Sequence, residues 1–199
     1  MSEHYYTEQP TSEIRERVFT SKIKDAQLTL TSVSGVFAFE NKVDRASELL
    51  IKAFQPSGRT ILDLGCGYGA IGLFIKSLYS DQALCLSDIN ERAIDYAMLN
   101  ASKNHLDVKV TKSDLFSSFD GIRFDDIVTN PPLATGKQLL TSLIEQAAYH
   151  LNPNGSLWLV AYHNKGGSTL KKIMEERFSN VRDVDKSGGI RVYKSELLA

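Results

Sequence analysis

The feature that most constrains the fold is a regular alternation of short apolar segments and helical patterns, which begins at Arg59. Five of the apolar segments have the length and composition of strands: 60–64, 83–87, 108–110, 126–129 and 156–161. Helices are predicted between them over about 70–79, 91–104 and 137–151. Short strands that alternate with helices are typical of βαβ units, so the sequence predicts an α/β fold around a mostly parallel sheet.

The C-terminal part of the chain predicts an antiparallel end to this sheet. The segment 152–155, Asn-Pro-Asn-Gly, is expected to form a turn before the fifth strand. After a predicted helix over about 167–178, residues 181–184 and 190–193 alternate around a Ser-Gly-Gly turn. Two alternating segments joined by such a turn predict a closing hairpin.

The first 40 residues do not follow the alternation. Residues 27–31 and 33–39 have the pattern of two short strands around a Ser-Gly turn, and a helix is expected over about 43–54. A chain of 199 residues suits one globular domain with a small appendage. We therefore expect an N-terminal β cap over 1–40 and a single α/β domain over 41–199.

Composition and charge narrow the functional classes. The net charge of -1 argues against a protein that coats nucleic acid by general electrostatics. The excess of 8 Lys and Arg over 5 Asp and Glu in residues 163–199 indicates either a substrate-facing rim or lysines on a solvated helix, and the second interpretation is simpler. Cys66 and Cys85 are too few for a zinc signature, so no metal is expected. Without a leader pattern or a long apolar run, the chain is expected to be cytoplasmic and free of membrane contacts.

A glycine-rich turn follows the first predicted strand. The segment 63–69, Asp-Leu-Gly-Cys-Gly-Tyr-Gly, leads into the next helix, so its glycines would let the backbone approach a ligand closely and its helix N-terminus would point amides at it. Gly65, Gly67 and Ala70 also fit the dinucleotide pattern G-x-G-x-x-A, with Asp88 at the end of the second strand. A nicotinamide cofactor is therefore a competing interpretation.

Aspartates at three successive strand ends favour adenosine joined to an amino acid over a dinucleotide. Asp63 precedes the glycines, where a carboxylate can accept from a charged amino group but would repel a pyrophosphate. Asp88 can accept both ribose hydroxyls. Asp114 can accept from an adenine amino group while Leu115 and Phe116 cover the ring. Each acid alone could cap a helix, but together at the carboxyl edge of a parallel sheet they predict a ligand site.

The segment Asn130-Pro131-Pro132-Leu133 follows the fourth predicted strand and so emerges at the same edge. An exocyclic amine on an aromatic base is a poor nucleophile that needs orienting more than deprotonating. The Asn130 oxygen and the Pro131 carbonyl can accept its two N–H groups, and the proline ring holds that carbonyl in place. Alone the segment could merely end a strand, but beside a donor site it predicts group transfer to a planar nitrogen.

Together these motifs resemble the methyltransferase small-domain family of class I, S-adenosylmethionine-dependent enzymes, which includes bacterial small-subunit rRNA guanine-N2 methyltransferases. The similarity extends to 34–37, 44–50, 150–158 and 191–194. It implies a Rossmann-like, seven-stranded sheet with an antiparallel last strand, and S-adenosyl-L-methionine as cofactor. The cofactor-binding residues that it implies are Asp63, Gly65, Cys66, Gly67, Asp88, Ile89, Asp114, Leu115 and Asn130. The catalytic residues that it implies are Asn130, Pro131, Pro132 and Leu133.

The sequence departs from this family in two ways. The fourth motif position, often an aromatic ring that stacks on the base, is Leu133; Phe37 is the first candidate to supply that ring, and Tyr5 and Tyr6 are others. Bacterial relatives often carry a duplicated N-terminal domain, which this chain is expected to lack. RNA recognition would then depend on the cap, on the C-terminal rim or on a homodimer.

The function that the resemblance implies is methylation of guanine N2 in small-subunit, 16S-type rRNA, with rRNA or the small ribosomal subunit as partner. The same Asn-Pro-Pro motif serves adenine N6 in nucleic acids and glutamine N5 in release factors, and it does not choose among them. From other classes, an NAD(P)-dependent oxidoreductase and a non-catalytic adenosine-binding module remain alternatives.

Overall fold

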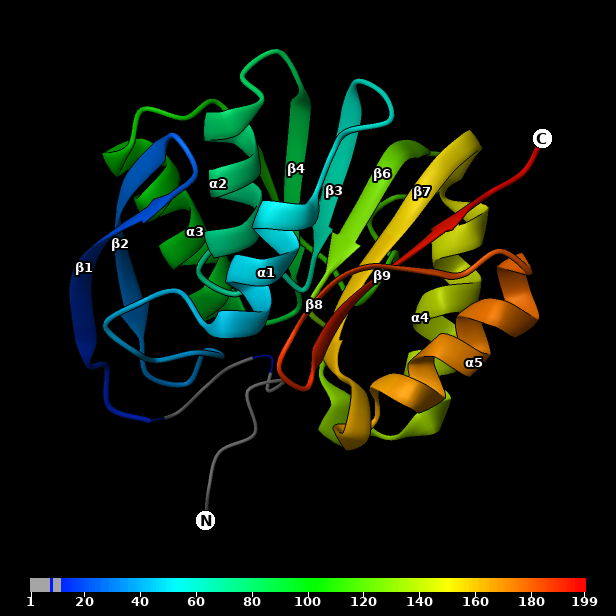
Figure 1. Cartoon of the computed structure of the whole chain (residues 1–199). Coiled ribbons are helices and arrows are strands. Elements are labelled where there is room, and N and C mark those ends of the chain that lie inside the picture. Colours follow the sequence, from blue (N-terminus) through cyan, green and yellow to red (C-terminus); the bar gives the residue numbers. More distant parts are fainter. Residues whose placement is uncertain (1–7, 9–11) are drawn as a thin grey trace.

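Seven strands form one twisted sheet in the computed structural model, which describes residues 8 and 12–199 (Figure 1). Their order is β5-β4-β3-β6-β7-β9-β8. The parallel strands are β3 (Thr60–Leu64), β4 (Ala83–Asp88), β5 (Lys109–Lys112), β6 (Phe124–Thr129) and β7 (Leu151–Tyr162). The closing hairpin consists of β8 (Arg182–Ser187) and β9 (Ile190–Glu196), and β9 pairs antiparallel with both β7 and β8. The predicted α/β class and its antiparallel end are confirmed.

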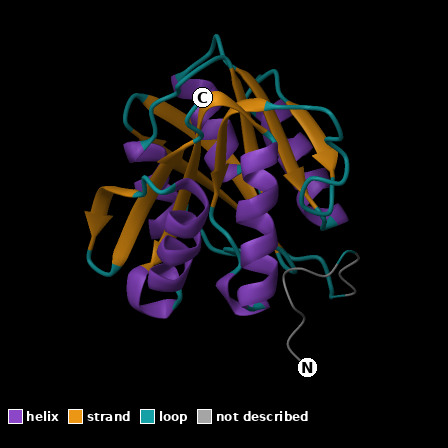
Figure 2. Ribbon diagram, turned by 90° about the vertical axis from the view of Figure 1, so that its right-hand side faces the viewer, coloured by secondary structure: helices purple, strands orange, loops and turns teal. Residues whose placement is uncertain are grey.

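Helices cover both faces of the sheet. One face carries α1 (Arg45–Ala53), α2 (Ala70–Leu78) and α3 (Glu91–Lys103), whereas α4 (Lys137–Tyr149) and α5 (Gly167–Phe178) pack side by side on the other (Figures 1 and 2). Each helix buries one stripe; in α4 it consists of Leu140, Leu143, Ile144, Ala147 and Ala148. This periodicity is why the helices lie within two residues of their predicted bounds. None of the helices in the described residues is long and apolar enough to cross a bilayer.

The N-terminal β cap exists, but its predicted strands were partly wrong. A separate two-stranded sheet consists of β1 (Glu16–Ile23) and β2 (Ala26–Val33), joined at Lys24, which has a φ of 52°. Residues 34–39 form turns instead of a strand. β1 escaped prediction because most of its side chains are exposed and they include few apolar residues, whereas 33–39 is apolar because Val36 is buried in the core. Tyr5 and Tyr6 lie outside the described residues.

Asn100 of α3 and Asn104, the C-cap of that helix, attach this hairpin to the rest of the molecule. The side chain of Asn100 accepts from the Thr31 N–H (2.8 Å) and donates to the Thr31 carbonyl (3.0 Å) and to the Tyr68 carbonyl (2.9 Å). Asn104 makes the equivalent pair of bonds with Thr29. The two asparagines are four residues apart, and their side chains reach alternate residues of β2. They thus bind backbone N–H and carbonyl groups on the edge of β2 that does not pair with β1.

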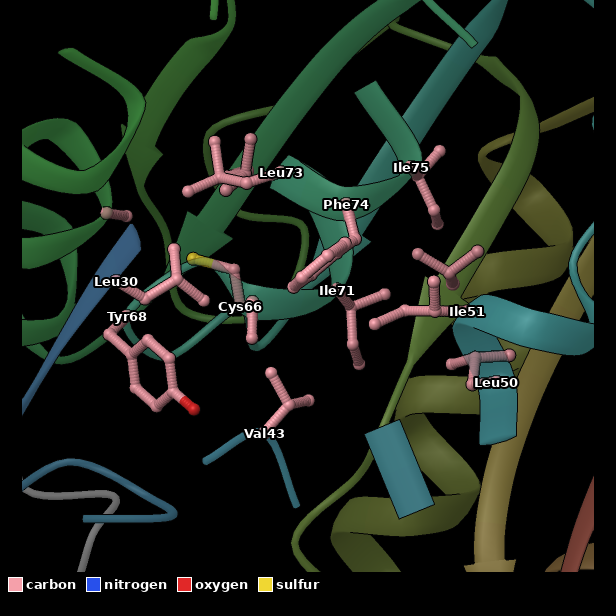
Figure 3. Packing of buried hydrophobic residues seen from close by; sticks show 14 of the residues in the cluster. Leu30, Val43, Leu50, Ile51, Cys66, Tyr68, Ile71, Leu73, Phe74 and Ile75 are labelled. Carbon is pink, nitrogen blue, oxygen red and sulfur yellow. The ribbon is translucent and has the colours of Figure 1, made fainter. Parts of the chain in front are cut away.

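Apolar packing joins the same parts. Leu30 of β2, Val43 before α1, and Tyr68 and Phe74 from the glycine turn and α2 lie in one buried cluster (Figure 3). The hairpin therefore shares a core with the helices that lie beside the glycine turn.

The expected turn at 152–155 is wrong, because β7 runs through this segment. The Asn154 N–H donates to the Leu197 carbonyl (2.7 Å), and the Leu197 N–H donates to the Gly155 carbonyl (2.8 Å). The pairing with β6 shifts register between Phe124 and Asp126 at this point. A Cβ at residue 155 would lie 2.8 Å from two backbone oxygens, so the glycine marks a close approach within an irregular strand.

Candidate active site

A cavity of about 410 Å³ opens at the carboxyl ends of β3, β4, β5, β6 and β7. Open α/β sheets bind their ligands at this edge. The predicted site residues that line it are Phe37, Gly65, Cys66, Gly67, Asp88, Ile89, Asp114, Leu115, Asn130, Pro131, Pro132 and Leu133. Residues that the sequence did not indicate as ligand contacts also line it, notably Asp44, Ser47, Tyr68 and Tyr162.

Asp63 is the predicted site residue that does not line this cavity. Its carboxylate is fully buried, and Oδ2 accepts the backbone N–H of Gly72 in the first turn of α2 at 2.8 Å. Oδ1 is buried and accepts no hydrogen bond from the described residues. Burial raises the pKa of Asp63 to about 7, although the Gly72 bond opposes this rise. Asp63 therefore places its carboxyl group beneath the glycine turn, at the N-terminus of α2.

Three consecutive backbone amides of the glycine turn are bound within the chain. The N–H groups of Gly65 and Cys66 donate to the Ser87 carbonyl (2.8 and 2.9 Å), and that of Gly67 donates to Asp88 Oδ2 (2.9 Å). A dinucleotide site needs such amides free for its pyrophosphate. These three N–H groups are engaged within the chain, and with acidic side chains at both Asp63 and Asp88 this turn suits a cationic ligand better than a pyrophosphate.

Asp88 is held firmly at the end of β4. Its Oδ1 accepts from the Asn90 N–H (2.9 Å) while Oδ2 accepts from Gly67, and burial raises its pKa. Each carboxylate oxygen can accept a second hydrogen bond, so the group is able to hold two neighbouring hydroxyls. Asp114 is exposed on another part of the lining, next to Leu115.

Phe116 does not cover a ligand ring as expected. It is buried and stacks on His150, with ring centroids 4.6 Å apart. Leu115 lines the cavity instead, in a left-handed conformation with a φ of 48°, so the chain turns between these two residues and sends their side chains to different places.

The burial of Asp63 predicts a pH dependence of stability. Because its pKa is about 7 in the folded protein against an ordinary 3.8, the folded state binds this proton more tightly. The free energy of unfolding should therefore fall as pH rises from about 4 to 7, by on the order of a few kcal/mol at about 1.4 kcal/mol per pKa unit. Urea unfolding at pH 5 and pH 8 measures this fall.

The matched variant is Asp63→Asn, whose amide oxygen can still accept from Gly72 but does not titrate. Its loss of stability between pH 5 and pH 8 should be clearly smaller than that of the unmodified protein. Equal losses in the two proteins would show that Asp63 is not the group responsible.

The amide of Asn130 is oriented by the beginning of α1. Its Nδ2 donates to Ser47 Oγ at 3.2 Å and lies 3.5 Å from Asp44 Oδ1. Asp44 is the N-cap of α1, and the same Oδ1 accepts from the N–H groups of Ala46 and Ser47. Since Nδ2 is engaged, the oxygen of Asn130, which accepts nothing from the described residues, is the atom left for a ligand in the cavity.

The prolines supply a second acceptor beside it. The Pro132 carbonyl accepts from the N–H and the hydroxyl of Thr135 (3.1 and 2.6 Å), the last residue of a 3₁₀ turn, η1 (Leu133–Thr135). The Pro131 carbonyl accepts no hydrogen bond from the part of the chain that the structure describes. Two acceptors next to each other in the chain can receive the two N–H groups of one planar amine.

Two aromatic side chains stand at the mouth of the cavity. Phe37 is 44% exposed and Tyr162 is 41% exposed, while most of the apolar lining is buried. Tyr162 ends a continuous apolar strand, so the sequence indicated core there and gave no signal of a ligand contact. No group of three or more His, Cys, Asp or Glu among the described residues could hold a metal ion.

A family model described as methyltransferase small domain matches residues 27–194. The chain belongs to this family. The fold and the family are those of S-adenosylmethionine-dependent methyltransferases.

Individual proteins of the methyltransferase small domain family are similar over most of this chain. It is 38% identical to the "Uncharacterized protein YbxB" of Bacillus subtilis, over 98% of this chain and 99% of that protein. It is 34% identical to the ribosomal RNA small subunit methyltransferase C of Haemophilus ducreyi, over 90% of this chain and 55% of that one.

A solved structure of the T. thermophilus 16S rRNA N2 G1207 methyltransferase, in complex with AdoMet and guanosine, matches with a TM-score of 0.80. The two chains are 28% identical, and the match covers 94% of this chain and 52% of the T. thermophilus chain. The chain thus spans about half the length of the rRNA methyltransferases that it matches.

Proposed function

We propose that this protein transfers the methyl group of S-adenosylmethionine to the exocyclic N2 of guanine in small-subunit rRNA. The observation that carries the proposal is the fixed amide of Asn130, whose Nδ2 is bound to Ser47 and whose oxygen is left for the cavity. An acceptor held in this way suits an amine that needs orienting more than deprotonating.

The residues of the cavity fit the cofactor. Asp88 is proposed to accept the two ribose hydroxyls, Asp114 the adenine amino group, and Ile89 and Leu115 to cover the adenine ring. Asp63, beneath the turn, is proposed to favour the positive charge of the amino-acid end. When bound, S-adenosylmethionine supplies an electrophilic methyl group.

The chemistry left to the protein is the orientation of the amine. The Asn130 oxygen and the Pro131 carbonyl would accept its two N–H groups, which fixes the plane of the amine and therefore the direction of the lone pair perpendicular to it. They would also stabilise the positive charge that develops as the N–CH₃ bond forms and the S–CH₃ bond of the cofactor breaks, with S-adenosylhomocysteine as the leaving group. The surplus proton then leaves to solvent, because an asparagine amide is no base.

Two observations support a nucleobase over the side chain of glutamine. Phe37 and Tyr162 offer half-exposed rings at the mouth, and aromatic stacking is how unpaired bases are commonly held. The T. thermophilus structure that this chain resembles carries guanosine and is named for guanine N2. Phe37 remains our first candidate for the stacking ring in place of an aromatic at Leu133.

We also make proposals about the domain organisation of the chain and its location in the cell. Residues 1–40 are proposed to act as a cap beside the catalytic domain of 41–199, in a cytoplasmic protein. Self-association stays a prediction, which the mass of the protein in solution tests directly.

The product identifies the substrate. The protein is incubated with S-adenosylmethionine labelled in its methyl group and, in parallel, with an unmodified small-subunit rRNA transcript, with small subunits that lack their native modifications, or with a release factor. Label in N2-methylguanosine supports the proposal. Label only in N6-methyladenosine or only in the release factor would overturn it in favour of the corresponding alternative.

A further inference from the structure

Most cationic side chains in the C-terminal part of the chain are engaged in ion pairs. Five of the lysines and arginines in 163–199 form ion pairs: Lys171, Arg177, Arg182, Arg191 and Lys194. Lys165, Lys172 and Lys186 form none with the described residues. Such exposed pairs add little stability, and Lys165, Lys172 and Lys186 are the cations of this region that no such pair engages.

Two of these three lysines lie beside the mouth of the cavity. Lys165 belongs to η2 (His163–Lys165), and its ammonium lies 5.6 Å from the centroid of the Tyr162 ring, which lines the cavity. Lys186 precedes the β8–β9 turn, whose Gly189 carbonyl accepts from the His163 N–H at 2.8 Å. The β8–β9 turn and η2 are therefore in direct contact at the carboxyl edge of the sheet.

A third lysine approaches from the Asn-Pro-Pro segment. Lys137 begins α4 directly after η1, is exposed, and forms no ion pair with the described residues. The two segments meet, since a Cβ at Gly166 would lie 3.7 Å from Leu133 Cβ. We call Lys137, Lys165 and Lys186 the basic rim.

Charge of the opposite sign gathers on the other part of the lining. The segments 131–144, 162–174 and 186–195, which carry the basic rim, contain no Asp or Glu, although Asp185 directly precedes the last of them. The proposed cofactor region instead has Asp88 and Asp114 on its lining, and Asp44 lies 3.5 Å from the amide of Asn130. One region therefore suits a cationic ligand and the other an anionic one.

We propose that the basic rim binds the phosphate backbone of the RNA that carries the target base; this inference rests on the proposed function. A chain with a net charge of -1 has no general attraction for RNA, so contacts have to be local. Lysines on long flexible stems around the mouth can contact phosphates on either side of a base that enters the cavity. The polyanion and the cationic cofactor then occupy separate regions.

Neutralising the basic rim tests this directly. For the triple variant Lys137→Gln, Lys165→Gln, Lys186→Gln, binding of an unmodified small-subunit rRNA transcript is measured at several salt concentrations. The slope of log K against log salt should shrink by about 2, given a slope of roughly 0.7–0.9 per phosphate contact. Affinity at low salt should fall about tenfold or more, in line with the loss of several phosphate contacts, while affinity for S-adenosylmethionine stays unchanged.

The matched control is Lys109→Gln. Lys109 is exposed and begins β5, at the opposite edge of the sheet from β8 and at the amino end of its strand. It should leave RNA binding and its salt slope as in the unmodified protein. If the unmodified protein methylates RNA and the triple variant binds and methylates it as well as the control does, the role of the basic rim is overturned while the proposed function stands. If the unmodified protein neither binds nor methylates RNA, the proposed function fails as well.

Discussion

Replacing Asn130 with alanine is expected to lower kcat by about 100-fold or more, by analogy with the loss of one preorganised contact to developing charge. The variant loses the oxygen that orients the amine, while the Pro131 carbonyl alone leaves the amine free to rotate. Affinity for S-adenosylmethionine should change little, because the proposed ribose and adenine contacts lie on β4 and after β5. Single-turnover methylation of the rRNA transcript, together with calorimetry of cofactor binding, separates the two quantities.

A graded variant tests the geometry behind this expectation. Ser47→Ala removes the acceptor of the Asn130 amide but keeps its oxygen, so kcat should fall about tenfold, as for the loss of one hydrogen bond of about 1.4 kcal/mol. Asn41→Ala, at an exposed position outside the cavity lining, is the control and should match the unmodified protein. A large loss of cofactor affinity in Asn130→Ala would instead place this residue in the cofactor site.

Replacing Asp88 with alanine should weaken S-adenosylmethionine binding by about 150-fold or more, since it removes two hydrogen bonds from hydroxyls to a charged group, each about 1.5–3 kcal/mol. It also releases the N–H of Gly67, which the carboxylate holds at 2.9 Å, so the glycine turn loses an internal support. Calorimetric titration with the cofactor gives the ratio of dissociation constants.

A purely structural role for Asp88 would look different. In that case thermal stability would fall while the folded variant kept its cofactor affinity. Asp120→Ala, at an exposed position outside the cavity lining, is the matched acidic control and should change neither quantity.

The parts of the fold that could be predicted are those in which burial follows a local period. α4 buries one stripe of apolar residues at helical spacing, and the short strands β3 and β4 are buried along most of their length. Both patterns can be recognised in the sequence itself. β1 could not be predicted, because its outer face is polar and its turn at Lys24 contains no glycine. The segment 152–155 has turn residues, but pairing with the end of β9 holds it in β7.

The residues of the candidate site also divide into those that the sequence could predict and those that it could not. Residues in motifs, such as Asp88 and Asn130, could be named because each follows a strand and parallel strands bring their carboxyl ends together. Ser47 could not, since its role depends on the beginning of α1 lying against the end of β6. The direction of the Asp63 carboxylate, toward Gly72 and not the cavity, also follows from helix packing that no local pattern records.

The side chain of Asn100 has a consequence for how the molecule opens. This one buried amide binds both Thr31 of the hairpin and the Tyr68 carbonyl of the glycine turn. Detaching the hairpin would leave polar groups of Asn100 and Thr31 unsatisfied and weaken the support of that turn, so the two belong to one cooperative unit in local unfolding. A ligand that stabilises the turn should therefore also slow hydrogen exchange at the Thr29 and Thr31 amides, far along the chain from the residues that it touches.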